Sequence, residues 1–580
     1  MNAVFIGGGS LRLLPLLRGV FANSPECFRN GEIRLVDRDI SRAEAVGKLM
    51  GACPEYRNVN CKIVWSDNLE ACLPGADVLY LTMGARSEPT YSQSMFISSR
   101  YGFFSTDNLS VNGAFLSLRL GRTILSIARQ MEKHCPQALM LIFANPVAVY
   151  SHLVNTHTRI RALGICGGYS NHRWDLTRIT GRDEYEPDWE VVAAGVNHLS
   201  FILRGSLHGR DLYSDILPEY LNDHWKPVDV TSPHEWARKN MVQGQYYRYW
   251  MFRRYGKIIF SGEADGTAFL FPKQEVSMQI ERFGAGEGFN AEAAKQAEQQ
   301  TIRENYRLLT EASKHPGEVD WNSPSGLFAR NERDIILPLF RAISGIEKMR
   351  IAASRPNSGA VRGFAPEMPL EYSMDILGKE ITPVENLYVP EPFGGLIAAL
   401  SEFQRLLSEA IAAWDPKIFA DALDAFPMQQ YTENRNAYYR EMFELFSDLD
   451  PHMLEAGKYF AASPHPAAPK YSIVKMNELS PVRCPCGFSR RAFASDDDKT
   501  ASLHLVDIQQ DSKVHYHQKH TEIYYILEGT GEMELDGEKI PLQPGVSIRI
   551  SPGCRHRASG KLKILNASIP AFDPQDEWFD

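Results

Sequence analysis

Short apolar runs alternate with helical stretches through residues 1–165, and this alternation restricts the fold more than any other feature of the sequence. The segments Ser41–Met50 and Ala114–Glu132 have helical spacing. Strands of a parallel sheet are buried on both faces, so in the sequence they are continuous runs of apolar residues. We therefore predict an α/β fold, a Rossmann-type doubly wound parallel sheet with helices on both faces. The predicted strands are Ala3–Ile6, Ile33–Val36, Cys61–Val64, Val78–Thr82 and Leu139–Phe143.

The first of these strands leads directly into a glycine loop. Gly7, Gly8, Gly9 and Ser10 follow it, and an apolar helical stretch comes next. A strand, a glycine turn and a helix N-terminus form a site for pyrophosphate, because the backbone can approach the phosphates and the helix dipole favours negative charge. The third glycine of the G-x-G-x-x-G pattern is missing, since Arg12 stands there.

Asp37 ends the second predicted strand and strengthens the dinucleotide interpretation. A carboxylate at this point can accept hydrogen bonds from ribose hydroxyls and would repel a 2′-phosphate, which favours NAD over NADP. The alternative is a plain glycine turn and a surface aspartate in another α/β sheet.

The rest of the chain changes character twice. From Trp189 to Gly457 it is mixed and mainly helical, with a clear helix at Asn290–Lys314, and we predict an α+β substrate domain. Closely spaced prolines at 464–469 indicate a linker. Short β-like runs follow it, at Glu522–Leu527, Gly531–Leu535 and Val546–Ile550. The predicted boundaries are 1–195 for the NAD-binding domain, 196–460 for the substrate domain, 461–470 for the linker and 471–580 for a β-barrel.

Composition excludes few functions. A net charge of -9 gives no general reason to bind nucleic acid. No apolar run reaches the roughly 18–20 residues of a membrane helix. Nine cysteines, an odd number, suggest no disulfide framework and are typical of a reducing compartment. We expect a cytoplasmic protein without nucleic-acid or membrane partners. Cys484 and Cys486 have no second pair of cysteines, so the sequence assigns them no role.

Several motifs occur in an order that resembles the family 4 glycoside hydrolases. The resemblance spans roughly residues 1–430, and no single motif carries it alone. It implies NAD, a divalent cation that is typically Mn²⁺, a carbohydrate substrate, a homo-oligomer and a lactate/malate dehydrogenase-like pair of domains. The motifs are Ile6–Ser10, Asp107, Asn145-Pro146, Gly164–Cys166, Gly195–His198, Tyr255-Gly256, Gly262-Glu263, and Asn357–Gly359 ahead of Pro366.

The resemblance implies an unusual mechanism for breaking a glycosidic bond. In that family the sugar is oxidised by NAD⁺ at C3, loses its C2 proton, eliminates the aglycone from C1, takes up water and is reduced again. Cys166 and His198 match the cation ligands, and the cation polarises the C3 carbonyl as a Lewis acid. Asn145 would hydrogen-bond substrate or nicotinamide. Taken alone, Cys166 would be a small buried hydrophobe and His198 a structural histidine.

The same resemblance suggests the acid–base residues. Glu263 is our candidate for the base at C2, where related sequences place Asp after Gly, and Asp265 is the reserve candidate. Asp107 matches the acidic residue that precedes the long helix and would protonate or orient the leaving group. The alternative is that these are solvated loop carboxylates.

Some positions depart from the common family pattern. Gly167 follows the metal cysteine where histidine often stands, and Ser110–Gly113 replaces a glycine-rich stretch. Glu263 is one methylene longer than the usual aspartate. These departures favour a divergent branch, nearer to the members that act on uronic acids or unphosphorylated sugars.

His515, His517, Glu522 and His556 have the spacing of the two cupin motifs. On a strand, H-x-H directs both imidazoles to one face, because side chains alternate with period two. Glu522 and His556 would complete a site of three histidines and one carboxylate for a divalent transition metal. The resemblance covers about residues 470–580 and implies an all-β cupin barrel. Cupins range from dioxygenases and isomerases to sugar-sensing and dimerising modules, and we favour a role in oligomerisation or ligand sensing over a second catalytic step. The alternative is a polar surface strand.

Three hypotheses about function remain open at this point. The first is a glycosidase that recycles NAD⁺ during each turnover. The second is an NAD-dependent dehydrogenase of a hydroxy acid or sugar acid, which a similar nucleotide fold would support. The third is a non-catalytic NAD and sugar sensor whose output is carried by the cupin. Net formation of NADH separates the first from the second, and binding without turnover would favour the third.

Overall fold

The structure is a computed structural model that divides into two compact units, Met1–Ser463 and Pro464–Asp580. The residues that the structure describes are 1–84, 90–167, 176, 179–181, 189–222, 225–227, 235–260, 266, 268–270, 291–323, 326–331, 334–427, 434–461, 473–484, 486–494, 499–509 and 511–579.

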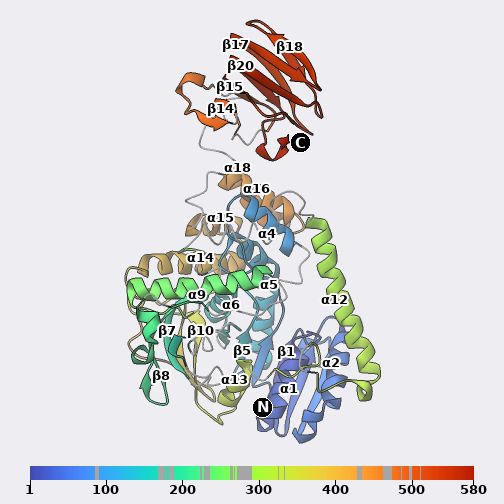
Figure 1. The fold of residues 1–580 in the computed structure, drawn as a ribbon. Helices are drawn as coiled ribbons and strands as arrows, with labels where there is room; N and C mark the ends of the chain where they lie inside the picture. The colour runs from blue at the N-terminus through green and yellow to red at the C-terminus, as the bar shows by residue number, and fades with distance from the viewer. Residues whose placement is uncertain are drawn as a thin grey trace. The chain divides into compact units, whose positions relative to one another are not determined.

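The first unit begins with the predicted parallel sheet (Figure 1). Its strands lie in the order β3-β2-β1-β4-β5-β6, which is the order of a Rossmann fold. All five predicted strands are confirmed, with ends that differ from prediction by one or two residues at most. The strands are β1 (Ala3–Ile6), β2 (Gly31–Val36), β3 (Cys61–Ser66), β4 (Val78–Leu81), β5 (Leu139–Ile142) and β6 (Arg161–Gly164).

Burial on both faces explains why these strands are apolar throughout. In β1, Ala3 and Phe5 belong to one core, which also contains residues of α1, α2 and α13. Val4 and Ile6 belong to a second core with α5, α6, α14, α15 and α16. The helices are α1 (Leu13–Asn23), α2 (Ile40–Ala52), α3 (Leu69–Cys72), α4 (Tyr91–Arg100), α5 (Val111–His134), α6 (Val147–His157), α13 (Ile336–Ile343), α14 (Gly394–Ala413), α15 (Pro416–Ala425) and α16 (Arg435–Leu445).

The sheet continues beyond β6 with antiparallel strands, which the sequence analysis did not predict. The full order is β3-β2-β1-β4-β5-β6-β10-β11-β7-β8-β9, with β12 paired to β11. Strands from residues 190–211 and 349–383 therefore extend the same sheet. The chain combines the predicted Rossmann-like region with a mixed second region that contains both helices and strands. The added strands are β7 (Glu190–Val196), β8 (Leu199–Leu207), β9 (Arg210–Asp211), β10 (Met349–Pro356), β11 (Pro369–Leu377) and β12 (Glu380–Pro383).

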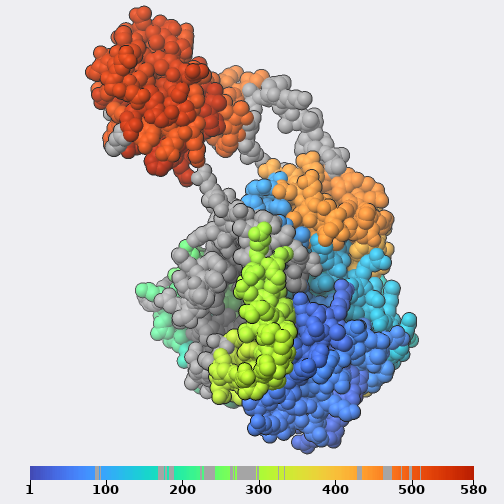
Figure 2. All heavy atoms as spheres, turned by 90° about the vertical axis from the view of Figure 1, so that its right-hand side faces the viewer, coloured from blue at the N-terminus to red at the C-terminus, as the bar shows by residue number. Residues whose placement is uncertain are grey.

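Among the remaining helices, α12 (Ala291–Lys314) confirms the predicted long helix. It packs against α2 and α4, and Figure 2 shows it lying along the N-terminal part of the chain. Within the described ranges, no helix combines the length and apolar character needed to cross a membrane. The other helices are α8 (Pro218–Leu221), α9 (Glu235–Tyr255), α17 (Pro451–Leu454) and α18 (Lys458–Ala461).

The second unit is an antiparallel sheet around a small apolar core that includes Ile526, Met533 and Ile564. Two predicted runs form one strand, β17, which bends where its register with β20 shifts between Ile526 and Glu528. The strands are β13 (Val482–Cys484), β14 (Gly487–Ala492), β15 (Ser502–Ile508), β16 (His515–Tyr516), β17 (Thr521–Leu535), β18 (Glu538–Leu542), β19 (Ser547–Ile550), β20 (His556–Ile569) and β21 (Trp578–Phe579).

Candidate functional site

The glycine loop and Asp37 form one unit at the carboxyl ends of β1 and β2. The Gly9 amide donates to Asp37 Oδ2 at 2.9 Å. Gly7 has φ +81°, and a Cβ on Gly8 would stand 2.7 Å from the carbonyl carbon of Leu35. Only glycine fits such a close approach and such a backbone angle. The loop sequence therefore follows from the way the chain turns over the sheet.

A cavity of about 830 Å³ opens beside this unit. Gly7, Ser10 and Asp37 line it, together with Thr82 after β4 and Tyr306 of α12. It lies between β1 and β4, where the order of the strands reverses and where doubly wound sheets bind their ligands. Its volume is of the size that ligand pockets have, about 300–1,000 Å³.

Tyr306 is a residue of this cavity that the sequence analysis missed. It comes from a helix far along the chain, and the guanidinium of Arg42 lies 3.8 Å from the centre of its ring. Burial raises the pKa of Tyr306, so its hydroxyl stays neutral. No local pattern in α12 marks this tyrosine, because its role depends on the packing of α12 against α2.

Arg12 occupies the position of the missing third glycine. Its Nη2 pairs with Asp334 at 2.9 Å, and its guanidinium lies 5.0 Å from the centre of the Phe143 ring. Burial alone would lower the pKa of Arg12, but Tyr80, Asp334 and Cys166 raise it. The departure from the glycine pattern thus places a basic side chain in the electrostatic surroundings of Cys166.

Cys166 and His198 are brought together although they are far apart in sequence. Cys166 follows β6, and His198 lies in the turn between β7 and β8. Cys166 Sγ is 3.4 Å from His198 Nε2. Bonds of roughly 2.1 Å to nitrogen and 2.3 Å to sulfur can reach both atoms from a single ion. The pair therefore satisfies the distance that a shared cation requires.

A row of paired residues crosses the sheet between these two elements. Gly164 pairs with Ser354, Ser354 with Glu371, and Glu371 with Gly195. This row fixes the ends of β6 and β7, which lead to Cys166 and His198. The antiparallel strands that sequence analysis did not predict are therefore the frame of the candidate metal site.

The turn that carries His198 is held in an uncommon backbone conformation. His198 has φ +69°, in the left-handed region that non-glycine residues seldom occupy. The buried carboxylate of Glu371 accepts from Asn197 Nδ2 at 2.7 Å and from Ser200 Oγ at 3.1 Å. Asn108 Nδ2 donates to Asn197 Oδ1 at 2.7 Å. These hydrogen bonds on both sides of His198 hold the turn.

Asp107 and Asn145 also meet, as neighbours in the first unit. Asp107 is buried, and its Oδ1 accepts a hydrogen bond from Asn145 Nδ2 at 3.2 Å. Glu263 and Asp265 lie outside the described residues. Gly266, which follows them, is described, and its Cα lies so close to the carbonyl oxygen of His198 that no Cβ would fit.

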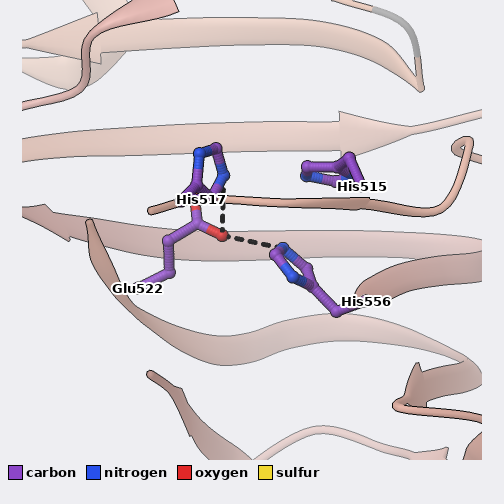
Figure 3. Close-up of side chains that lie close together, drawn as sticks. All are labelled: His515, His517, Glu522 and His556. Carbon is purple, nitrogen blue, oxygen red and sulfur yellow. Dashed lines mark hydrogen bonds and ion pairs between the residues drawn. The ribbon is translucent and has the colours of Figure 1, made fainter. Parts of the chain in front are cut away.

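The second unit contains a compact cluster of metal-ligating side chains. One ligand atom from each of His515, His517, Glu522 and His556 lies within 4.8 Å of all the others. Figure 3 shows the Glu522 carboxylate between His517 and His556. Its Oε2 is 3.6 Å from His517 Nε2 and 3.0 Å from His556 Nε2. All four predicted ligands therefore lie close together in the structure.

Neighbouring groups orient this cluster. Asn566 Nδ2 donates to Glu522 Oε1 at 2.7 Å, and His517 Nδ1 is 2.7 Å from the carbonyl oxygen of Asp576. Burial alone would raise the pKa of Glu522, but the hydrogen bond from His556 and the nearby imidazoles lower it to about 2. The same bond raises the pKa of His556 against the effect of burial. Burial and the charge of His556 lower the pKa of His515 to about 4.

Three family models match the chain. The model of the family 4 glycosyl hydrolases matches residues 2–180, and the model of their C-terminal domain matches residues 193–428. The cupin domain model matches residues 503–561. The chain belongs to the family 4 glycosyl hydrolases and carries a C-terminal cupin domain. The predicted family and the predicted fold class are both confirmed.

Relatives of the chain share modest identity with it. An α-galacturonidase of Thermoanaerobacter italicus is 21% identical over 467 residues, which are 77% of this chain and 96% of the relative. An α-galactosidase of Bacillus subtilis is 25% identical over 271 residues, which are 44% of this chain and 61% of the relative. A 6-phospho-α-glucosidase from gut microorganisms, solved in complex with NAD and Mn²⁺, has a TM-score of 0.61 at 17% identity and covers 78% of this chain and 98% of its own.

Proposed function

We propose that this chain cleaves O-glycosidic bonds by oxidation of the sugar at C3, removal of the C2 proton, elimination of the aglycone from C1 and addition of water. When bound, NAD⁺ would supply the reversible oxidation at C3, and a divalent cation would polarise the carbonyl that results. The observation that carries the proposal is the 3.4 Å contact between Cys166 Sγ and His198 Nε2 in a family 4 chain.

The large cavity supports the proposal of NAD as cofactor. The glycine loop supplies a surface without side chains, and the Gly9 amide holds Asp37 in place at its wall. A carboxylate there would accept hydrogen bonds from the adenosine ribose. Gly8 and Gly9 do not line the cavity. They pack behind its wall, where Gly8 approaches the backbone of Leu35 and Gly9 approaches the side chain of Arg42. Asn145 would bind nicotinamide or substrate.

The donor set of Cys166 and His198 fits a divalent cation such as Mn²⁺. A thiolate and an imidazole are common ligands of divalent transition metals, and sugar hydroxyls would complete the coordination. The buried Asn197–Glu371–Ser200 hydrogen bonds keep His198 in place. Outer hydrogen bonds of this kind orient metal ligands and tune their affinity.

The acid–base roles follow the family pattern. Glu263 would remove the C2 proton, Asp265 is the reserve candidate, and Asp107 would protonate or orient the leaving group. The burial of Asp107 and its hydrogen bond to Asn145 support a fixed role for its carboxylate. Gly266, which follows Asp265 in the sequence, lies against the His198 carbonyl.

We propose a uronide or another unphosphorylated glycoside as the substrate. Two α-galacturonidases are among the relatives and align with 77% and 68% of this chain. The departures at Gly167, Ser110–Gly113 and Glu263 agree with a branch away from the phospho-glycosidases.

For the second unit we propose a divalent transition metal on His515, His517, Glu522 and His556, with a role in oligomerisation or ligand sensing. A cytoplasmic location stays a prediction from the sequence. A homo-oligomer stays a prediction of the family resemblance.

The test is turnover of aryl glycosides and aryl uronides with NAD⁺, Mn²⁺ and a reductant, performed in D₂O. The expected result is many aglycones released for each cofactor, no net NADH, and solvent deuterium at C2 of the sugar product. Accumulation of one NADH per product would support a dehydrogenase instead. Release of aglycone without deuterium at C2 would contradict the elimination mechanism. Thermal stabilisation by NAD and sugars without any turnover would support a sensor.

A further inference from the structure

Two cysteine sulfurs meet at the cavity of the cupin unit. Cys484 Sγ lies 3.3 Å from Cys486 Sγ. Both residues line the cavity of about 90 Å³ whose wall also contains His515, His517 and Glu522. The sequence assigned this pair no role, because two cysteines with one residue between them form no metal motif by themselves. The structure gives them a shared position and a shared cavity.

Cys484 and Cys486 each have a backbone contact with a neighbouring strand or loop. Cys484 ends β13, and its register partner is Gly487, the first residue of β14. Gly487 has φ +151°, and a Cβ at this position would collide with the carbonyl oxygen of Asp507. The carbonyl oxygen of Cys486 accepts from the Gln509 amide at 2.9 Å. Strand pairing at Cys484 and the backbone hydrogen bond at Cys486 therefore hold the backbone of both cysteines.

We propose that Cys484 and Cys486 form a reversible thiol–disulfide exchange site whose oxidant is a low-molecular-weight disulfide. A disulfide bond is about 2.05 Å long, so the sulfurs need to approach by only roughly 1.3 Å. Both residues are half-buried, so a small disulfide can reach them. A ring closed over so few residues is strained, and strained disulfides are the ones that are easily reduced.

The exchange has two steps. Cys484 thiolate attacks one sulfur of the small disulfide, breaks its S–S bond and releases one small thiolate. Cys486 thiolate then attacks the Cys484 sulfur of the mixed disulfide and releases the second small thiolate. The cysteine pair loses two electrons and two protons, and the small disulfide is reduced to two thiols. A small dithiol or thiol in excess reverses both steps.

The surroundings favour Cys484 as the attacking thiol. The hydrogen bond between the two sulfurs and the backbone amides of Cys486 and Gly487 lower the pKa of Cys484, with a smaller contribution from Arg491. The hydrogen bond to Cys484 and burial raise the pKa of Cys486. A thiolate attacks and a thiol does not, so the two cysteines have different roles. Glu577, which also lines the cavity, adds negative charge beside Cys486.

The experiment equilibrates the full-length protein with mixtures of oxidised and reduced glutathione, with a chelator present, and then alkylates the free thiols. Intact mass and peptide mapping are measured for each mixture. The expected result is loss of two alkylation sites, at Cys484 and Cys486 together, and their full return on reduction. If both sites are alkylated in every mixture, the proposal is wrong.

Variants assign the roles of the two thiols. Cys486→Ser should trap a glutathione adduct on Cys484, because no second thiol resolves it. Cys484→Ser should form little adduct on Cys486. Cys554→Ser, which changes another half-buried cysteine of the same unit, should behave like the natural protein. Equal adduct formation in the two single variants would contradict the proposal that Cys484 attacks first. Loss of the disulfide in Cys554→Ser would contradict the proposal that Cys484 and Cys486 are the two partners. The measurement on the unaltered protein does not depend on any variant folding.

Discussion

The two candidate metal sites of this chain are built in opposite ways. In the cupin unit, His515 lies on the short strand β16 and His517 directly follows that strand, while Glu522 and His556 come from strands that pair with each other. In the glycosidase unit, Cys166 and His198 follow strands that are separated in the sheet by β10 and β11. The first site depends on local strand geometry, and the second depends on the order of a large sheet. We therefore expect single substitutions to affect turnover and metal affinity differently at the two sites.

The largest expected effect is on the glycosidase site. Cys166→Ser or His198→Ala removes one of the two protein ligands that we identify, and a Lewis acid contributes several kcal/mol to the transition state. A loss of about 4 kcal/mol lowers the rate roughly a thousandfold. Aglycone release measures the activity, and titration with NAD should show little change in binding.

Cys61→Ser is a matched control for the cysteine variant. It changes a half-buried cysteine of β3, away from the candidate metal pair, and should keep full turnover. If Cys166→Ser or His198→Ala retained normal Mn²⁺-dependent turnover, the assignment of the metal pair would be wrong.

The contrast between the two sites also explains what could be predicted from sequence. Strands β1 to β5 and the H-x-H motif were predicted because burial on both faces and the period of two act within a few residues. The motifs of Cys166 and His198 could be identified only by resemblance to a family. Their contact follows from long-range pairing, which no local spacing encodes.

Strands β10 and β11 were missed for a related reason. They carry charged residues that stay within the sheet only because partners meet them. Arg350 forms two hydrogen bonds with Asp375, and Glu371 accepts from Asn197 and Ser200. Such residues look polar in sequence and are satisfied only in the folded protein. The contacts of Arg12 and Tyr306 were missed in the same way, since their partners are distant in the chain.

The next largest effect is expected in the cupin unit. Glu522→Gln removes the carboxylate that lies between His517 and His556, and affinity for a divalent transition metal should fall by at least about a hundredfold. Equilibrium dialysis of the full chain measures bound metal. Turnover of glycosides should stay unchanged, because the ligands of the glycosidase site come from the other unit.

Glu532→Gln serves as the control for that variant. Glu532 is an exposed residue of the same strand and pairs with Lys539 at 3.4 Å. The Glu532→Gln variant should bind metal with the affinity of the natural protein. Equal metal binding by Glu522→Gln and Glu532→Gln would exclude Glu522 from the metal centre.

A smaller effect is expected from the frame of the glycosidase site. Glu371→Gln keeps the shape of the side chain but replaces an oxygen that accepts from Asn197 or Ser200 with an amide donor. Loss of a hydrogen bond to a charged group costs about 1.5–3 kcal/mol, and affinity for Mn²⁺ should fall about 10- to 100-fold. Turnover as a function of Mn²⁺ concentration separates this loss of affinity from a loss of maximal rate.

Glu380→Gln on the exposed strand β12 is the control, and it should leave the Mn²⁺ dependence unchanged. If Glu371→Gln needed no more Mn²⁺ than the natural chain, the buried hydrogen bonds would not position His198.

The cupin site should also respond to pH in a direction set by its ion pair. The pKa of His556 is raised by Glu522, so the protonated imidazole stabilises the metal-free fold below the ordinary histidine pKa, and this contribution is lost as pH rises through the raised value. Metal needs the neutral imidazole, so its affinity should rise with pH by up to about tenfold per pH unit across this range. Isothermal titration calorimetry in buffers of different ionisation enthalpy should show proton release on metal binding. Affinity that falls as pH rises through neutrality would contradict this assignment.

The smallest effect is expected at the proposed dinucleotide site of the glycosidase unit, which shares no proposed ligand with either metal site. Asp37→Asn removes the charge that should repel a 2′-phosphate, while its remaining carbonyl oxygen can still accept from the Gly9 amide. The preference for NAD over NADP should fall by about tenfold, which corresponds to about 1.4 kcal/mol. Asp39→Asn is the matched control, because it changes the same charge two residues away and Asp39 does not line the cavity. Dissociation constants for both cofactors, measured without sugar or metal, report on the dinucleotide site alone. If Asp37→Asn kept the same preference for NAD over NADP, the carboxylate would support the glycine loop and would not contact the adenosine ribose.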